Sequence, residues 1–406
     1  MKRISMLGSC FLLVSAALAA EPEPQAFVAH SATGEAVSGA IQSLASDWTV
    51  ALAGEIEAKI PGVDLISIRH KDALLPPLPA GRQVIFANGD RLSGDVLAIE
   101  KDQVRFRVIL GTGREADQEI AIPLSALAVI WFQSPPAHND PTRQWLSENR
   151  RKDLVLLNNG DALFGSVIGM KTVTQPFRLN DGKRETSIET SHIVALAMNT
   201  DLARTLRPRG TYGRLVLANG CRLALLSAHA DERELRGKTL FGGEVRIPWD
   251  QIVSLDIRHG KAVYLSDLKP KAYEHTPYLG QRWNYEMDRS VAGLPLRLKS
   301  SWFDKGIGLH SESRLSFTLN GNYRRFESLV GLDDQTGHGG AVRIAVLADG
   351  KPKDLGAARD LSFATGPRLI HVDIMGAKEL TLVVEFGPGA DICDHVDWAN
   401  ARVIKE

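Results

Sequence analysis

The chain has 406 residues, with 48 basic and 48 acidic side chains, 44% hydrophobic residues and three cysteines. Balanced charge excludes a general attraction to nucleic acid or anionic membranes. The hydrophobic content excludes a disordered or collagen-like chain, and three cysteines are too few for a disulfide scaffold. The 36 glycines and 19 prolines indicate many turns and few long helices.

The first twenty residues have the pattern of a secretory signal peptide. Lys2 and Arg3 precede a short apolar run, and Ala17–Ala19 supplies a small-x-small cleavage site. The run is too short to span a bilayer, and no second one follows. We therefore expect a secreted or periplasmic protein without a membrane span after cleavage, rather than one with a retained N-terminal anchor.

A weak repeat fills the N-terminal two thirds of the chain. Its opening is an alternating apolar run followed by Asn-Gly-Asp, in clear copies that end at Asp90 and Asp161, while a third copy has Cys221 in place of the aspartate. A fainter copy lies near Gly34. Asn-Gly suits a tight hairpin turn, and alternation places one strand face on a core. Each copy is predicted to be a meander of strands, with both aspartates as turn residues.

This pattern resembles the first half of an Sm-like or SH3-like barrel, which implies small barrel-shaped units. Sm-like barrels bind RNA, but the units lack a concentrated basic and aromatic face, so no nucleic-acid function is expected. The fold class predicted for the whole chain is all-β, with repeated small barrels or meanders before a C-terminal jelly-roll sandwich. The predicted division is a signal peptide at 1–20, β repeats at 25–72, 82–134, 153–200 and 213–262, a short helix or linker at 140–152, and the sandwich at 273–406.

The sequence changes character after about residue 278, where short apolar runs alternate with glycine and aspartate turns. Ordered motifs appear there: Trp283, Asp288–Leu296, Asp304–Ser311, Val330–Asp334, Asp349–Lys351, Gly376–Leu380 and Asp394–Ala401. In this order they resemble the NPCBM family of carbohydrate-binding modules over the full domain, about a third of the chain. The resemblance implies a galactose-binding-like jelly roll and, as in those members that have been tied to a ligand, glycan binding. It does not imply catalysis.

Sugar recognition needs polar groups that pair with hydroxyls and an aromatic face for the apolar side of the ring. The predicted carbohydrate-binding residues are His310, Asp394, His395, Asp397 and Trp398. Structural alternatives remain open. A core position is favoured for Trp398, which leads into an apolar strand. His310 can equally hold a strand end through hydrogen bonds, and the aspartates are more often turn residues than ligands.

Two further features near these residues have open interpretations. Asp391 adds to the predicted site residues a cluster of oxygen ligands compatible with a structural calcium ion, and no other cofactor is expected. The polar loop Asp333–Gly340 is expected to be a hairpin connection, relevant to binding only if it folds beside His310. For Cys221 and Cys393, two buried free thiols are favoured over a disulfide.

Motifs for hydrolases, zinc proteases, phosphate loops and dinucleotide binding are absent from the sequence. We therefore predict a non-enzymatic protein whose C-terminal module binds a glycan or polysaccharide, with the repeats as a spacer or a docking platform for another envelope protein. The alternatives are an interaction or structural envelope protein that lacks sugar binding, and a glycoside hydrolase accessory or unrecognised glycosidase.

Overall fold

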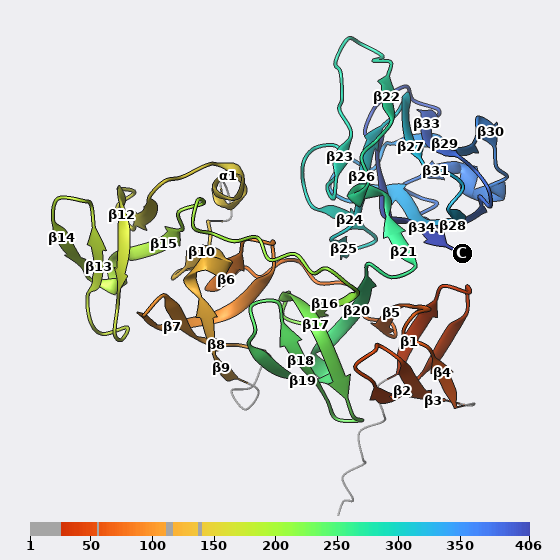
Figure 1. Ribbon diagram of the computed structural model, residues 1–406. Coiled ribbons are helices and arrows are strands. Elements are labelled where there is room, and N and C mark those ends of the chain that lie inside the picture. The colour runs from red at the N-terminus through yellow and green to blue at the C-terminus, as the bar shows by residue number, and fades with distance from the viewer. Residues whose placement is uncertain (1–25, 55–56, 111–116, 137–139) are drawn as a thin grey trace, which may run out of the picture.

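A computed structural model describes residues 26–54, 57–110, 117–136 and 140–406, so the predicted signal peptide lies outside the described residues. Almost all of the regular secondary structure in the described chain is β-strand, which confirms the all-β prediction. None of its helices is long and apolar enough to cross a membrane. A row of β meanders lies beside a separate β-sandwich (Figure 1).

The meanders form four units, each defined here by its strands: unit 1 (β1 to β5), unit 2 (β6 to β10), unit 3 (β11 to β15) and unit 4 (β16 to β20). In units 1 and 2 the strands are β1 Phe27–Ser31, β2 Ala36–Leu44, β3 Val50–Ala53, β4 Ala58–Ile60, β5 Leu65–His70, β6 Gln83–Phe86, β7 Arg91–Glu100, β8 Gln103–Val108, β9 Gln118–Pro123 and β10 Leu127–Trp131. In units 3 and 4 they are β11 Asp153–Leu157, β12 Ala162–Gly169, β13 Phe177–Asn180, β14 Glu185–Ile188, β15 Ile193–Ala197, β16 Tyr212–Leu217, β17 Arg222–Ala230, β18 Glu234–Thr239, β19 Glu244–Pro248 and β20 Ile252–Arg258.

Short helices connect some of these strands: η2 Leu124–Ala126, η3 Thr190–His192, η4 Trp249–Gln251 and α1 Thr142–Ser147. The last of these lies within the helix expected at 140–152. It is held against unit 2 because Trp145 stacks on Trp131 at 5.6 Å between ring centroids, and the Trp131 indole donates to Thr142 Oγ1 at 3.1 Å.

The Asn-Gly motif forms the turn between the first two strands of units 2, 3 and 4. Gly89, Gly160 and Gly220 have nearly identical φ angles of 85°, 88° and 87°. Positive φ at this position is what a tight hairpin requires and what glycine adopts without strain. The predicted hairpin turns are therefore confirmed.

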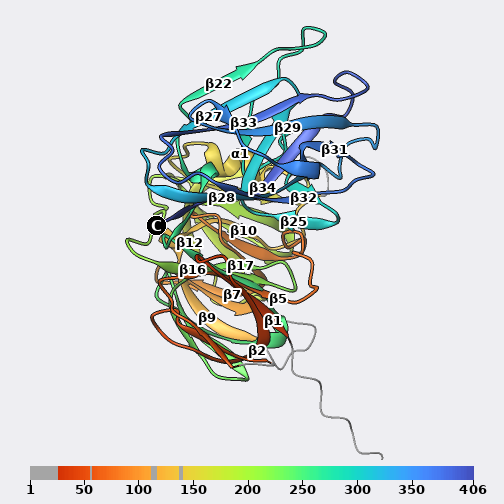
Figure 2. The same cartoon turned by 90° about the vertical axis from the view of Figure 1, so that its right-hand side faces the viewer.

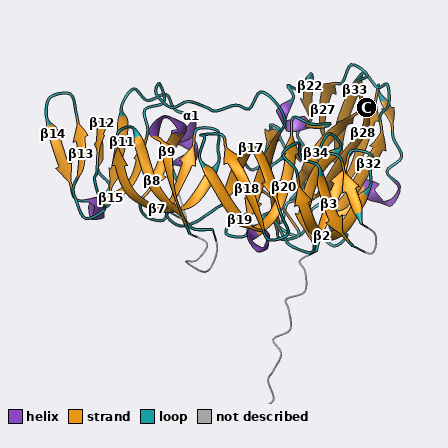
Figure 3. Ribbon diagram, turned by 60° about the horizontal axis from the view of Figure 1, so that its bottom comes forward, coloured by secondary structure: helices purple, strands orange, loops and turns teal. Residues whose placement is uncertain are grey.

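The units join edge to edge in the order 1, 4, 2, 3 (Figure 3). Strand β5 pairs with β20, and β10 pairs with β15, both antiparallel. Units 2 and 4 meet where Arg91 of β7 lies opposite Arg222 of β17. One core of buried side chains runs through all four units, so they form a continuous body rather than isolated beads.

Asp90 and Asp161 occupy the same position of the repeat but have different roles. Asp161 is an exposed turn residue, as predicted. Asp90 is buried, accepts a hydrogen bond from the Ala224 backbone at 2.8 Å and pairs with Arg214. The prediction that Asp90 is merely a turn residue is wrong, because the edge-to-edge packing of unit 4 against unit 2 covers its carboxylate.

The cysteine at the equivalent position of unit 4 makes the reciprocal contact. Cys221 is buried, and its Sγ accepts from the Ser93 backbone of unit 2 at 3.1 Å. Cys393, in the sandwich, is half-buried. Both thiols are free, which excludes the disulfide alternative and confirms free thiols, although only Cys221 is fully buried.

The C-terminal sandwich consists of two antiparallel sheets and a hairpin. One sheet contains β21 Ala262–Tyr264, β23 Glu286–Met287, β26 Gly306–His310, β28 Tyr323–Leu332, β32 Arg368–Asp373 and β34 His395–Lys405. The other contains β22 Ala272–His275, β27 Ser313–Thr318, β29 Ala341–Ala348, β30 Lys351–Pro352, β31 Asp360–Ser362 and β33 Glu379–Phe386, and the hairpin is β24 Leu296–Leu298 with β25 Ser301–Phe303. The short helices are η5 Leu265–Asp267 and η6 Gly356–Arg359. Because β21 pairs with β34, the sandwich begins ahead of the boundary expected at residue 273.

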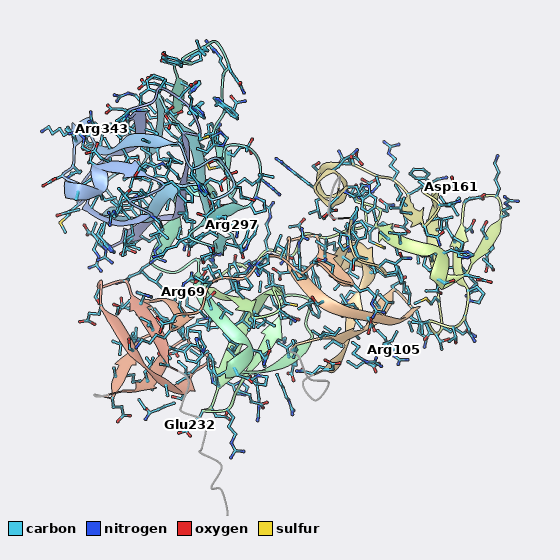
Figure 4. The ribbon with its side chains drawn as sticks, turned by 180° about the vertical axis from the view of Figure 1, so that it is seen from behind. Arg69, Arg105, Asp161, Glu232, Arg297 and Arg343 are labelled. Carbon is cyan, nitrogen blue, oxygen red and sulfur yellow. The ribbon has the colours of Figure 1, made fainter. Side chains whose placement is uncertain are left out.

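The sandwich rests on the row of units (Figure 2). The segment between units 1 and 2 lies in this contact, where the Leu75 amide donates to Ser301 Oγ and the Trp302 amide donates to the Leu75 carbonyl, both at 3.1 Å. Arg222 of unit 4 donates to Asp304 at 3.1 Å. Figure 4 shows Arg297 on the side of the sandwich that faces the row.

Candidate functional site

Three rings gather at one end of the sandwich, and we call Trp283, His310 and His395 the ring cluster. Trp283 and His310 stack with 4.9 Å between centroids and an interplanar angle of 3°. His395 meets the indole edge-on at 5.1 Å and lies 5.4 Å from His310. His310 is buried, whereas Trp283 and His395 are half-buried, so the cluster borders the solvent.

Strand pairing positions both histidines. His310 is the last residue of β26 and lies opposite His395, the first residue of β34. Trp283 comes from the segment between β22 and β23, where its carbonyl accepts from the Tyr273 hydroxyl at 2.7 Å. Strands of the scaffold therefore fix the two imidazoles, and a hydrogen bond fixes the backbone that carries the indole.

Asp394 adjoins this cluster as a buried carboxylate with one free oxygen. Its Oδ1 accepts from the Ala341 amide at 3.1 Å, whereas Oδ2 has no hydrogen-bond partner among the described residues. Burial raises the Asp394 pKa from 3.8 to about 6. A buried polar atom without a partner is uncommon in proteins, so Oδ2, although enclosed in this structure, is the oxygen of this carboxylate that is left for a ligand hydroxyl.

The two imidazoles are neutral at physiological pH. Burial, followed by the fields of His395 and His275, lowers the His310 pKa to about 4. Burial also lowers the His395 pKa, and its Nδ1 lacks a hydrogen-bond partner in the described structure. A neutral imidazole has one donor and one acceptor nitrogen, which suits hydroxyl groups better than anions.

Residues 261–404 match the NPCBM/NEW2 domain family. The C-terminal third is an NPCBM-like module. A Renibacterium salmoninarum protein, named as a candidate endo-alpha-N-acetylgalactosaminidase, is 28% identical over 112 residues, which cover 28% of this chain and 7% of that protein. The matching segment therefore spans only a small part of that curated relative.

Two solved Clostridium perfringens structures are similar to the chain. CBM51-2 with INT domains of ZmpB, in complex with GlcNAc, is 26% identical with a TM-score of 0.32, covering 42% of this chain and 36% of that one. CBM51 of GH95, in complex with methyl-galactose, is 27% identical with a TM-score of 0.31, covering 35% and 99%.

Two predicted binding residues of the NPCBM-like module are enclosed in the protein, which corrects their assignment. Trp398 is fully buried and packs against Phe326 between the sheets, because it points inward from the central strand β34. Asp397 points to the opposite face, where the β24–β25 hairpin covers it and the Arg297 amide donates to its Oδ2 at 3.1 Å.

Sequence reasoning missed Trp283 as a site residue. It stands in the family motif, but only the fold shows that it meets the two histidines. The loop Asp333–Gly340 lies beside this site, since the Asp333 amide donates to the His395 carbonyl at 2.9 Å and a Cβ at Gly337 would lie 2.8 Å from Cys393 Sγ. These contacts place the loop next to His395 and Cys393, and His395 is the strand partner of His310.

Proposed function

We propose that this is an exported carbohydrate-binding protein without catalytic activity, whose NPCBM-like module holds a neutral sugar at the ring cluster. The observation that carries the proposal is a half-buried indole beside two neutral imidazoles and the unpartnered Asp394 carboxylate oxygen. Those groups match the two needs of sugar binding, an aromatic surface and convergent polar atoms.

Each group has a separate role in this proposal. The apolar face of a sugar ring packs against Trp283, which is large enough to bury much of it. A sugar hydroxyl donates to Asp394 Oδ2, and the imidazoles of His310 and His395 complete the polar contacts. Hydrogen bonds to a charged group are stronger than those between neutral groups, so Asp394 contributes most of the orientation.

The row of units serves as a spacer or docking platform for another envelope protein. Its continuous core and its contact with the sandwich give the module a fixed support. A structural calcium ion near Asp391 is a secondary proposal. In the described residues no three His, Cys, Asp or Glu side chains are grouped as metal ligands. A thermal shift on adding calcium and its reversal by chelator would support the ion, and no shift would refute it.

A glycan array with the full chain is the first test, followed by calorimetric titration. Methyl-galactose and GlcNAc, which are bound in the two solved modules, are the first ligands. We expect Trp283→Ala to raise the Kd for the sugar about tenfold. The control is His192→Ala, which should leave the Kd unchanged because His192 is exposed on unit 3. No bound glycan, or equal affinity in both variants, would overturn the proposal, and turnover of an aryl glycoside would overturn its non-enzymatic part.

A further inference from the structure

A cavity lies between the row of units and the sandwich. Its volume is about 790 Å³, within the range of small-molecule sites. Six cationic side chains line it: Arg91 from unit 2, Arg214, Arg222 and Arg258 from unit 4, and Arg289 and Lys305 from the sandwich. The carboxylates in the lining are Asp267, Asp288 and Asp304.

Those carboxylates are already engaged by two of the cations. Lys305 pairs with Asp267 at 2.5 Å and with Asp288 at 2.7 Å. Arg222 pairs with Asp304 at 3.1 Å. Arg214 and Arg258 pair with aspartates that lie behind the cavity wall, Asp90 and Asp256.

Arg91 and Arg289 remain without a carboxylate partner within 4.0 Å in the described part of the chain. Arg91 makes a long hydrogen bond of 3.5 Å to Gln83 Oε1, and Arg289 donates to the Gly293 carbonyl at 2.9 Å. Burial lowers the pKa of both guanidinium groups, and the charges of Arg289 and Arg222 lower that of Arg91 further, against the opposing field of Asp140. An anion placed between these arginines would relieve their repulsion.

The cavity also offers surfaces for a ring. Tyr212 and Trp302 line it, and both are half-buried. Arg258 is buried over the Tyr264 ring at 4.0 Å, and its Nη1 has no hydrogen-bond partner in the described structure. Planar guanidinium groups match carboxylate and sulfate geometry. The lining therefore combines anion donors with aromatic faces.

We propose that this cavity binds an anionic saccharide unit, whose carboxylate or sulfate lies between Arg91 and Arg289 and whose ring packs beside Trp302. The proposal rests on the proposed function only for the ligand being a saccharide. The site is separate from the ring cluster, because Lys305 precedes the first residue of β26 and His310 is its last. A ligand here would touch units 2 and 4 and the sandwich at once.

The test is calorimetric titration of the full chain with galacturonic acid, galactose 6-sulfate, inorganic sulfate and galactose. We expect one or both anionic sugars to bind, with affinity that falls as salt is added. Galacturonic acid alone would identify a carboxylate as the ligand group, and galactose 6-sulfate alone would identify a sulfate. Arg91→Gln and Arg289→Gln should each weaken that binding about tenfold to hundredfold. Arg246→Gln is the control, since Arg246 is exposed on β19, and it should bind like the wild type.

Two further experiments distinguish this site from the ring cluster. His310→Ala should keep anionic-sugar binding, and saturating methyl-galactose should not displace an anionic sugar from the wild-type protein. Binding of inorganic sulfate, without binding of either anionic sugar, would overturn the assignment of a saccharide ligand. Unchanged affinity in both arginine variants, displacement by methyl-galactose, or no anion binding at all would overturn the site. The competition experiment uses the wild-type protein, so it tests whether the two sites are separate even if a variant does not fold.

Discussion

Replacement of Asp90 by alanine tests how units 2 and 4 are joined. The Asp90 carboxylate accepts from the Ala224 amide at 2.8 Å and pairs with Arg214. A buried amide left without a partner costs about 1–3 kcal/mol, and removal of one partner from a largely buried ion pair costs about 3–5 kcal/mol. Because the two costs overlap, we expect a loss of about 3–5 kcal/mol in the free energy of unfolding, or about 5–10 °C in Tm.

The matched control is Asp161→Ala, at the same repeat position in unit 3. Asp161 is exposed, and its side chain accepts only from Asn159, at 2.7 Å, among the described residues. Surface substitutions of this kind change stability by about 0.5 kcal/mol or less. Scanning calorimetry of both full-length variants measures the difference. Tm values for Asp90→Ala and Asp161→Ala that agree within about 1 °C would refute the reasoning.

Four further expectations concern the sandwich and its contact with the row of units. The affinity for the sugar should fall about five- to tenfold between pH 7 and 5, because Asp394, with a pKa of about 6, is protonated in this range. The affinity of the Asp394→Asn variant, measured by calorimetric titration, should not change over the same pH range. Because burial raises this pKa from 3.8, the stability contribution of Asp394 is fully present below pH 3.8 and lost as the pH rises through about 6, so the Tm of Asp394→Asn relative to wild type should rise over that window. Trp398→Ala should destabilise the fold by about 3–5 kcal/mol in urea unfolding, and a well-folded variant would contradict the core position of this indole. Arg222→Met should lower Tm by leaving Asp304 unpaired, whereas Arg105→Met at an exposed ion pair should not, and equal Tm values would count against the contact between row and sandwich.

Local sequence patterns predicted the hairpin turns, but they did not predict which residues distant in sequence contact one another. Asn-Gly dictates a hairpin through backbone geometry alone, so the turns at Gly89, Gly160 and Gly220 follow from sequence. The repeat motif is the same around Asp90 and Asp161, and only the edge that covers Asp90 distinguishes them. That edge belongs to a strand far along the chain, which no local pattern specifies.

The site shows the same limit. His310, Asp394 and His395 were predicted from motif chemistry, and strand pairing brings them to one end of the sandwich. Trp398 was assigned to the site although its apolar strand context favoured the core, and burial decides for the core. Trp283 was not assigned, because its position beside two histidines depends on contacts distant in sequence.

The order in which the units join has a consequence for synthesis. Unit 4 lies between units 1 and 2, yet it is the last of the four to be made. The edge of β5 must therefore wait for β20, across a separation of 187 residues between Arg69 and Asp256. Exposed strand edges are templates for pairing with other chains. The nascent protein therefore carries an open edge while these 187 residues are made, and protection of β5 is a condition for its productive assembly.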